Sequence, residues 1–110
     1  MTLVQRSSDY IVAGYINKIQ YVALQHMIAS HFNFNVGKFC HLVQNLHIYD
    51  RHFEAANEIL NKRRPEKNTN YRIGIKKESI GKNFYDYTLD DFYIESPKVK
   101  PLNAKLPLAI

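Results

Sequence analysis

The sequence predicts an α+β fold, in which two helices pack on one face of a mixed or antiparallel sheet. Residues 36–49 alternate in hydropathy, which is typical of a strand that is buried on one side. Apolar residues recur at helical spacing within residues 17–30 and again within 53–60. The chain has 110 residues, 45% of them hydrophobic, so it can bury one modest core and we expect a single domain.

The first half of the chain contains three expected elements. Residues 2–16 form an extended, partly buried segment that breaks near Gly14. Residues 17–30 follow as a helix, because their apolar side chains fall on one helical face. A turn at residues 33–35 then leads into the long strand 36–49.

The second half contains a second helix and shorter strands. Asp50 can cap a helix that runs to about residue 62, where basic side chains suit the negative helix end and Pro65 stops it. The remaining segments follow from turn signals and alternation: a polar loop at 65–70, strands at 71–76 and 87–95, and an irregular tail at 97–110.

Composition narrows the class of protein. The formal net charge is +5 and the isoelectric point is near 9.4, which favours anionic ligands. A single cysteine rules out an internal disulfide framework and fits a reducing compartment, so we expect a cytoplasmic protein. The sequence has neither a signal peptide at its start nor an apolar run long enough for a membrane span, so we expect no membrane partner.

Five consecutive residues near the N-terminus combine the groups that a phosphate beside a polar ring requires. They supply an amide, a guanidinium, two hydroxyls and a carboxylate: Gln5, Arg6, Ser7, Ser8 and Asp9. Arginine binds phosphate through two parallel hydrogen bonds, and a neighbouring hydroxyl can add a third. We therefore interpret Arg6 and Ser7 as phosphate ligands, with Gln5 contacting the ligand or holding Arg6.

A second candidate group lies where the long strand ends. His47 and Tyr49 are two residues apart and share a strand face, and an imidazole and a phenol can both hydrogen-bond a sugar hydroxyl. Asn17 carries an amide that can read the edge of a base, although with Gln20 three residues later it also fits a helix-capping pair. Side chains suited to bind a phosphate, a sugar and a base together predict a nucleotide site.

Three other readings use some of the same residues. Zinc binding by Cys40, His41, His47 and His52 fits badly, because Cys40 and His41 point to opposite strand faces and no second cysteine lies at ligand spacing, so we expect no metal. A hydrolase triad of Ser7, His47 and Asp9 is compatible with the spacing, but no nucleophile elbow frames the serine. Nucleic-acid binding through the basic residues 62–64 is disfavoured, since no aromatic RNA-binding signature is present.

The candidate residues also carry a resemblance to thymidylate synthase. Gln5-Arg6-Ser7-x-Asp9, then Asn17, then His47-Ile48-Tyr49 resembles the C-terminal part of that family in order and spacing. The likeness continues in further segments over nearly the whole chain: Tyr21-Val22-Ala23-Leu24, Val36-Gly37-Lys38-Phe39, residues 84–92 and Leu106-Pro107-Leu108-Ala109-Ile110. It implies that residues 1–110 are the C-terminal part of a thymidylate synthase domain, with 97–110 as a tail that closes over the ligands.

The resemblance implies roles for individual residues. Deoxyuridylate (dUMP) would be bound by Gln5, Arg6, Ser7, Ser8, Asp9, Asn17, His47, Ile48 and Tyr49. Asp9 would lie between pyrimidine and folate and support catalysis. Asn17 would read the uracil edge, because related deoxycytidylate hydroxymethylases carry Asp there. Reduced folate would contact Asp9, Val12, Ile16 and Ala109.

Two features depart from the family pattern. The family's nucleophilic cysteine lies upstream, in a Pro-Cys-His segment, whereas Cys40 falls within a strand, where we expect a packed thiol. The chain therefore resembles a C-terminal fragment that is inactive alone. Its Ala13-Gly14-Tyr15-Ile16-Asn17 and Val43-Gln44-Asn45 also differ from the common Gly-Leu-Pro-Phe-Asn and Gly-Gly-Asp, as in a subset of bacterial members.

The function implied by the resemblance is reductive methylation of dUMP to thymidylate (dTMP). A thiolate adds to the uracil ring, and methylenetetrahydrofolate supplies the carbon and the hydride. The implied partners are dUMP, reduced folate and a second copy in a homodimer. Two alternatives stay open: a non-catalytic nucleotide-binding fragment, and a pyrimidine nucleotide hydroxymethylase of the same fold.

Overall fold

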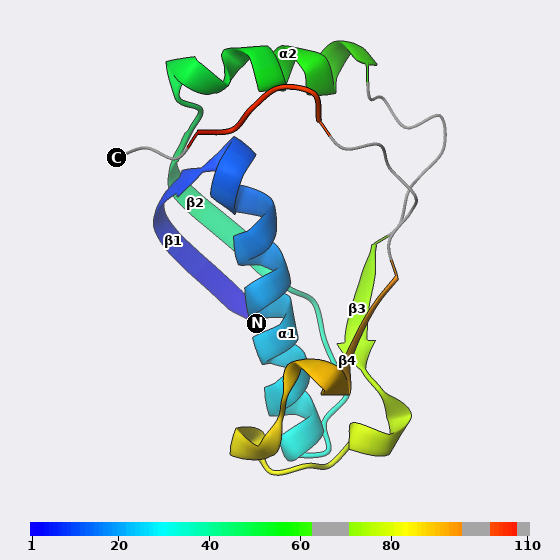
Figure 1. The fold of residues 1–110 in the computed structure, drawn as a ribbon. Coiled ribbons are helices and arrows are strands. Elements are labelled where there is room, and N and C mark those ends of the chain that lie inside the picture. Colours follow the sequence, from blue (N-terminus) through cyan, green and yellow to red (C-terminus); the bar gives the residue numbers. More distant parts are fainter. Residues whose placement is uncertain (63–70, 96–101, 108–110) are drawn as a thin grey trace.

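The computed structural model describes residues 1–62, 71–95 and 102–107 (Figure 1). Its helices and strands, in chain order, are β1 (Thr2–Asp9), the π-helical segment η1 (Tyr10–Gly14), α1 (Tyr15–His31), β2 (Cys40–His47), α2 (Phe53–Lys62), β3 (Arg72–Ile75) and β4 (Phe92–Glu95). Short 3₁₀ turns are η2 (Asp50–His52), η3 (Lys77–Ser79), η4 (Phe84–Asp86) and η5 (Leu89–Asp91). The predicted α+β class is confirmed.

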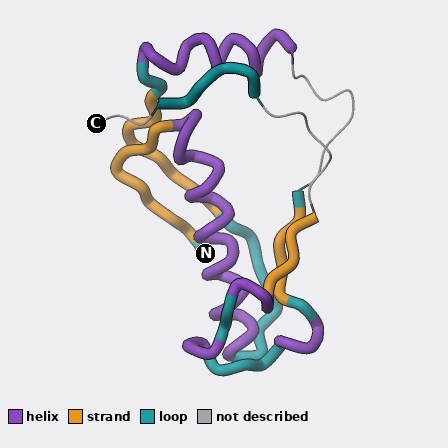
Figure 2. Tube along the Cα trace, viewed as in Figure 1, coloured by secondary structure: helices purple, strands orange, loops and turns teal. Residues whose placement is uncertain are grey.

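Parallel and antiparallel pairing are divided between two small sheets. β1 and β2 pair in parallel, with Leu3 opposite His41 and Asp9 opposite His47, and β3 pairs with β4 in antiparallel fashion. α1 returns the chain from the end of β1 toward the start of β2, and Figure 2 shows it running beside the parallel pair. Parallel strands need such a crossover, and it places both strand ends at the same edge.

The extended N-terminal segment is shorter than the sequence predicts. β1 ends at Asp9, whose Oδ1 accepts a hydrogen bond from the Val12 backbone N–H at 3.4 Å and so caps the turn that follows. Residues 10–14 are helical rather than extended, and α1 begins at Tyr15. Asn17 therefore lies inside the first turn of α1, and its reading as a helix cap is wrong.

The long strand is also shorter than predicted, since β2 spans only Cys40–His47. Upstream of it, the Gln25 side chain donates to the backbone carbonyls of Gly37 and Lys38 at 3.1 and 3.3 Å. The N-terminal ammonium of Met1 also donates to Lys38 O, at 2.8 Å. The backbone carbonyls before Cys40 are thus satisfied by a helix side chain and the chain terminus, where β1 offers no further residue for pairing.

α2 begins close to the predicted position and holds part of the tail. The side chain of Glu58, which is buried, accepts hydrogen bonds from the backbone N–H groups of Asn103 and Ala104 at 3.1–3.2 Å. Figure 1 shows the described tail segment running along α2. The predicted stop at Pro65 and the loop 65–70 lie outside the described residues.

The far end of α1 is tied to the turns between β3 and β4. Ser30 Oγ accepts hydrogen bonds from the Gly81 backbone N–H at 2.9 Å and from the Tyr87 hydroxyl at 2.8 Å. Gly81 has φ of +84°, a conformation that a side chain would strain. The predicted strand 87–95 is confined to Phe92–Glu95, because η5 precedes it.

Few apolar side chains are buried in the described part of the chain. Ala29 and Ala55 are its buried hydrophobic residues. An open apolar groove of about 1020 Å³ separates α1 from the β3–β4 pair, and its lining includes Ile19, Leu24 and Met27 on the helix side. The described residues therefore expose much of the surface that would normally form a core.

Candidate functional site

The candidate site lies at the edge where β1 and β2 end together. Asp9 and His47 are register partners, preceded by the pairs Ser8–Leu46 and Ser7–Asn45. Register partners in a parallel ladder present their side chains to the same face. Residues 5–9 and the pair His47 and Tyr49, which the sequence predicts to bind a nucleotide, therefore lie side by side, although about forty residues separate them along the chain.

His47 and Tyr49 lie together, as their shared strand face predicts. Their rings meet edge to face with centroids 5.0 Å apart. His47 Nδ1 donates to the Asn45 carbonyl at 3.3 Å, since a carbonyl can only accept, and in the neutral ring Nε2 is then a hydrogen-bond acceptor. The guanidinium of Arg51 lies 5.3 Å from the centre of the Tyr49 ring. An acceptor nitrogen and a phenol hydroxyl are thus available in one place.

The carboxylate of Asp9 is held between two elements. While Oδ1 caps η1, Oδ2 faces His52 Nδ1 at 3.6 Å. The His52 side chain is fully buried, and Nε2 donates to the Pro107 carbonyl at 2.9 Å. From the sequence, His52 was considered only as a member of the rejected zinc cluster. Its position five residues after His47 was a better indication that it lies near the site.

The phosphate-reading string alternates across the strand. Gln5 Oε1 accepts from His41 Nε2 at 2.8 Å and Gln5 Nε2 donates to the Ser7 carbonyl at 2.9 Å, so Gln5 braces the two strands. Arg6 is exposed and Ser7 is half-buried. Ser8 is buried, and its hydroxyl lies at a cavity of about 220 Å³ between the strands and the start of α1.

The other predicted ligand residues are less closely grouped. Val12 is half-buried in η1 and bonded to Asp9, and Asn17 is half-buried in the first turn of α1. Ile48 is partly exposed between the two ring residues, whereas Ile16 is 63% exposed and lines the apolar groove toward β3 and β4. Ala109 lies outside the described residues.

The prediction of a packed Cys40 thiol is wrong, because Cys40 is exposed. It shares a sheet face with Val4 and Leu42, which are register partners and are 63% and 58% exposed. No described element covers that face of β1 and β2. The hydropathy alternation correctly identified a strand, but it could not show which of its faces is covered.

The described part of the chain shows neither a metal-binding cluster nor a membrane-spanning helix. Within it, no three His, Cys, Asp or Glu side chains are grouped so that they could hold a metal ion. None of its helices combines the length and apolar character that a membrane span requires.

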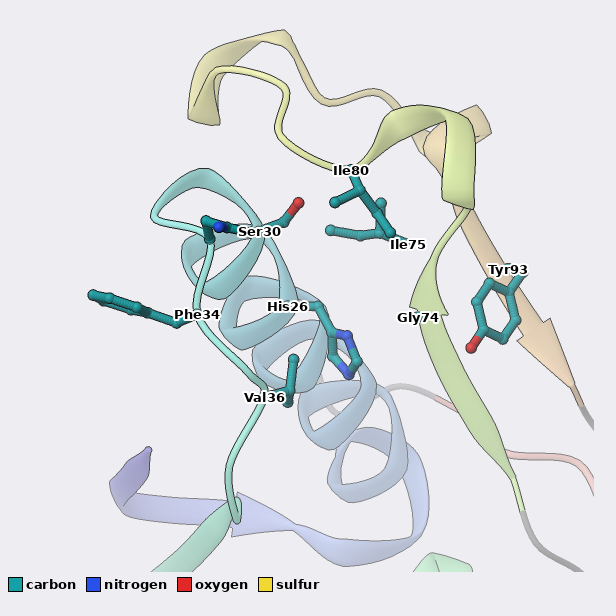
Figure 3. A pocket seen from close by; sticks show the side chains of 9 residues that line it. His26, Ser30, Phe34, Val36, Gly74, Ile75, Ile80 and Tyr93 are labelled. Atoms are coloured by element: carbon teal, nitrogen blue, oxygen red, sulfur yellow. The ribbon is translucent and has the colours of Figure 1, made fainter.

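A second, smaller cavity of about 180 Å³ lies between α1 and β3 (Figure 3). The His26 imidazole points into it from the helix, and burial lowers the pKa of His26 from its ordinary value of 6.5. On the other side of β3 the Tyr93 ring lies against Gly74, so closely that a Cβ at residue 74 would be 2.6 Å from the Tyr93 hydroxyl. None of the predicted nucleotide ligands lines this cavity, which we read as a packing feature.

The chain is similar to known proteins in family pattern, in sequence and in structure. The family model for thymidylate synthase matches residues 1–110. Thymidylate synthase from Lactococcus lactis subsp. cremoris is 47% identical over 110 residues, and that from Streptococcus pneumoniae is 48% identical; each alignment covers 99% of this chain. The solved thermostable thymidylate synthase A from Bacillus subtilis superposes with a TM-score of 0.70 at 26% identity, covering 97% of this chain and 36% of that one.

All of these matches name thymidylate synthase, and all of them cover nearly the whole of this chain. The chain spans 38% of the length of the curated relatives it matches. The match runs across both the β1–β2 edge and the β3–β4 unit, so it is not confined to one motif. This chain belongs to the thymidylate synthase family.

Proposed function

We propose that this chain is the nucleotide-binding portion of a thymidylate synthase, a methyltransferase that converts dUMP to dTMP with methylenetetrahydrofolate. The observation that carries the proposal is the parallel register of β1 and β2, which sets Asp9 beside His47. Family membership over residues 1–110 supports the same role. The domain assignment follows: residues 1–110 form the C-terminal part, with 97–110 as its closing tail.

The ribose and the phosphate are assigned to different strands. At the end of β2, His47 Nε2 accepts a hydrogen bond from a ribose hydroxyl, and the Tyr49 hydroxyl, two residues further along the chain, donates one. On β1, the exposed guanidinium of Arg6 pairs with the phosphate, assisted by the Ser7 hydroxyl. Gln5, Ser8 and Ile48 complete the edge around these contacts.

The base and the folate meet at Asp9 and α1. Asn17 reads the uracil edge from the first turn of the helix, and Asp9 supports catalysis beside it. The reduced folate supplies a one-carbon unit and a hydride. Its proposed contacts besides Asp9 are Val12, whose backbone N–H is bonded to that carboxylate, Ile16 and Ala109.

The nucleophilic thiolate is proposed to come from outside this chain. Cys40 is its single cysteine and lies on an outer sheet face, away from the edge where Asp9 meets His47. The small number of buried apolar side chains supports folding together with further structure, which would fill the groove beside α1. The 110-residue chain alone is therefore proposed to be inactive.

A homodimer is proposed for the complete enzyme. The exposed register partners Val4 and Leu42 form an apolar patch on the open face of β1 and β2. Exposed apolar patches are typical of subunit interfaces. The single cysteine fits a reducing compartment, so we propose that the enzyme acts in the cytoplasm.

Asn17 allows a test of the proposed function against the hydroxymethylase alternative. In the complete protein, titration calorimetry should show that dUMP binds more tightly than deoxycytidylate, and Asn17→Asp should reverse the preference, because a carboxyl group offers the base a different hydrogen-bonding edge. A wild-type protein that prefers deoxycytidylate would favour the hydroxymethylase. Binding of dUMP without any dTMP formation would favour the non-catalytic alternative.

A further inference from the structure

His52 occupies the point where the candidate site meets the tail. It closes η2, which follows directly after Tyr49, and its backbone N–H donates to the Tyr49 carbonyl at 2.8 Å. The ring centroids of Tyr49 and His52 lie 6.0 Å apart. The backbone of His52 is thus fixed to a residue that we assign to ribose binding.

The two nitrogens of the fully buried His52 ring face different parts of the molecule. Nε2 donates to the Pro107 carbonyl at 2.9 Å, so this nitrogen carries a proton. Nδ1 faces Asp9 Oδ2 at 3.6 Å and has no hydrogen-bond partner among the described residues. A buried polar ring is costly unless its atoms are matched, so both neighbours bear on how the ring is held.

A second contact fixes the segment 102–107 independently. Glu58, on α2, accepts from the backbone N–H groups of Asn103 and Ala104. These two contacts hold the segment at both ends of its described length. Only the His52 contact also faces the β1–β2 edge, because the opposite side of the same ring meets the Asp9 carboxylate.

We propose that His52 is a positioning residue that couples the Asp9 carboxylate to the docking of segment 102–107. The buried ring is a rigid body between the two groups, so a shift of the Asp9 carboxylate that lies against Nδ1 also moves the Nε2–H relative to the Pro107 carbonyl. By linkage, docking of the segment in turn holds the carboxylate in place. The inference rests on the proposed function in that Asp9 lines the nucleotide site, and it assigns His52 no contact with substrate.

Amide hydrogen exchange of residues 103–106 in the complete protein tests the coupling. His52→Phe removes both polar contacts and should raise the exchange rate about tenfold, as expected for one buried hydrogen bond. His52→Gln keeps a donor near the position of Nε2, so it should retain most of the protection. His31→Phe, at the exposed far end of α1, is the matched control and should leave exchange unchanged.

The decisive comparison adds Asp9→Ala, which removes the group that lies against Nδ1. With His52 present, Asp9→Ala should raise exchange of residues 103–106 several-fold; with His52→Gln, it should raise it no further. Equal effects of Asp9→Ala in both backgrounds, or unchanged exchange in His52→Phe, would overturn the coupling. Titration with dUMP is run in parallel, so that a wild-type protein that binds no dUMP refutes the proposed function, while exchange still decides the role of His52.

Discussion

Asp9 and His47 are the last register partners of the parallel β1–β2 pair. Both strands run in the same direction, so this pairing brings residues 5–9, which include Arg6, to the same edge as residues 47–49. A one-residue slip in register would turn Asp9 and His47 to opposite faces. The arrangement of the nucleotide site therefore depends on how the two strands pair.

Replacing Arg6 should separate phosphate binding from nucleoside binding. In the complete protein, Arg6→Ala should weaken dUMP binding by roughly 1.5–3 kcal/mol, as expected for a charge-assisted contact, and barely change deoxyuridine binding. Arg6→Lys keeps the charge but loses the planar fork, so its loss should be intermediate. Calorimetric titration of the wild type and both variants measures these affinities. Equal losses of dUMP and deoxyuridine binding in Arg6→Ala would remove the phosphate assignment.

The open face of β1 and β2 should be covered by a second subunit. Leu42→Lys should shift the complete protein from dimer to monomer in sedimentation experiments, because it places a charge in an apolar interface. Cys40, on the same face, should react slowly with a thiol reagent in the dimer and rapidly in the variant. Leu60→Lys, an exposed position on α2, is the control. A wild-type monomer with rapid labelling would contradict the proposal.

The sequence predicted which helices and strands are present better than it predicted where they begin and end or which residues they contact. Alternation identified the strand that contains His47, but it could not reveal that Gln25 satisfies the backbone carbonyls before Cys40. Local capping signals suggested that Asn17 begins a helix, whereas Asp9 and η1 start the helical stretch earlier. The first difference arises from a contact between residues of different elements, and the second from a capping bond between Asp9 and Val12 that the hydropathy pattern does not reveal.

The candidate site, too, could be predicted only in part from the sequence. His47 and Tyr49 could be paired from strand periodicity alone, and their rings do meet. The meeting of Asp9 with His47 needed the strand register, which periodicity does not give. His52 was missed as a site neighbour because its partner Pro107 lies 55 residues away and its burial depends on the fold.

Close packing between Gly74 and Tyr93 predicts that a side chain at residue 74 is destabilising. Gly74→Ala should lower the free energy of unfolding by about 1–3 kcal/mol, because the added Cβ would force the Tyr93 ring to move. In a Tyr93→Ala background the same change should cost little. Gly37→Ala, with no atom within 4 Å of its Cβ, is the control. Urea unfolding measures each difference, and an equal cost with and without the Tyr93 ring would exclude this clash.

Asp91 should make the protein sensitive to acid. The Lys82 ammonium, then the Ser79 hydroxyl and the Thr88 N–H, hold the pKa of this buried carboxyl well below its ordinary value of 3.8. Since the folded-state pKa is the lower one, the stabilisation is fully present above pH 3.8 and is lost as the pH falls toward the folded-state value.

Two variants isolate this contribution in unfolding experiments. Asp91→Asn should be less stable than the wild type at neutral pH, and the difference should narrow as the pH is lowered below 3.8. Asp90→Asn, at the exposed neighbouring position, should change stability little at any pH. A constant difference between wild type and Asp91→Asn across this range would rule out the assigned titration.

Formation of dTMP by a fusion protein tests the central claim most directly. The part of the Lactococcus lactis thymidylate synthase that precedes the aligned region would be joined to this chain, whose 47% identity to that enzyme favours a compatible core. With dUMP and methylenetetrahydrofolate, the folded fusion should produce dTMP and the 110-residue chain alone should not. A fusion that melts cooperatively but neither binds dUMP nor yields dTMP would contradict the claim, as would turnover by the chain alone.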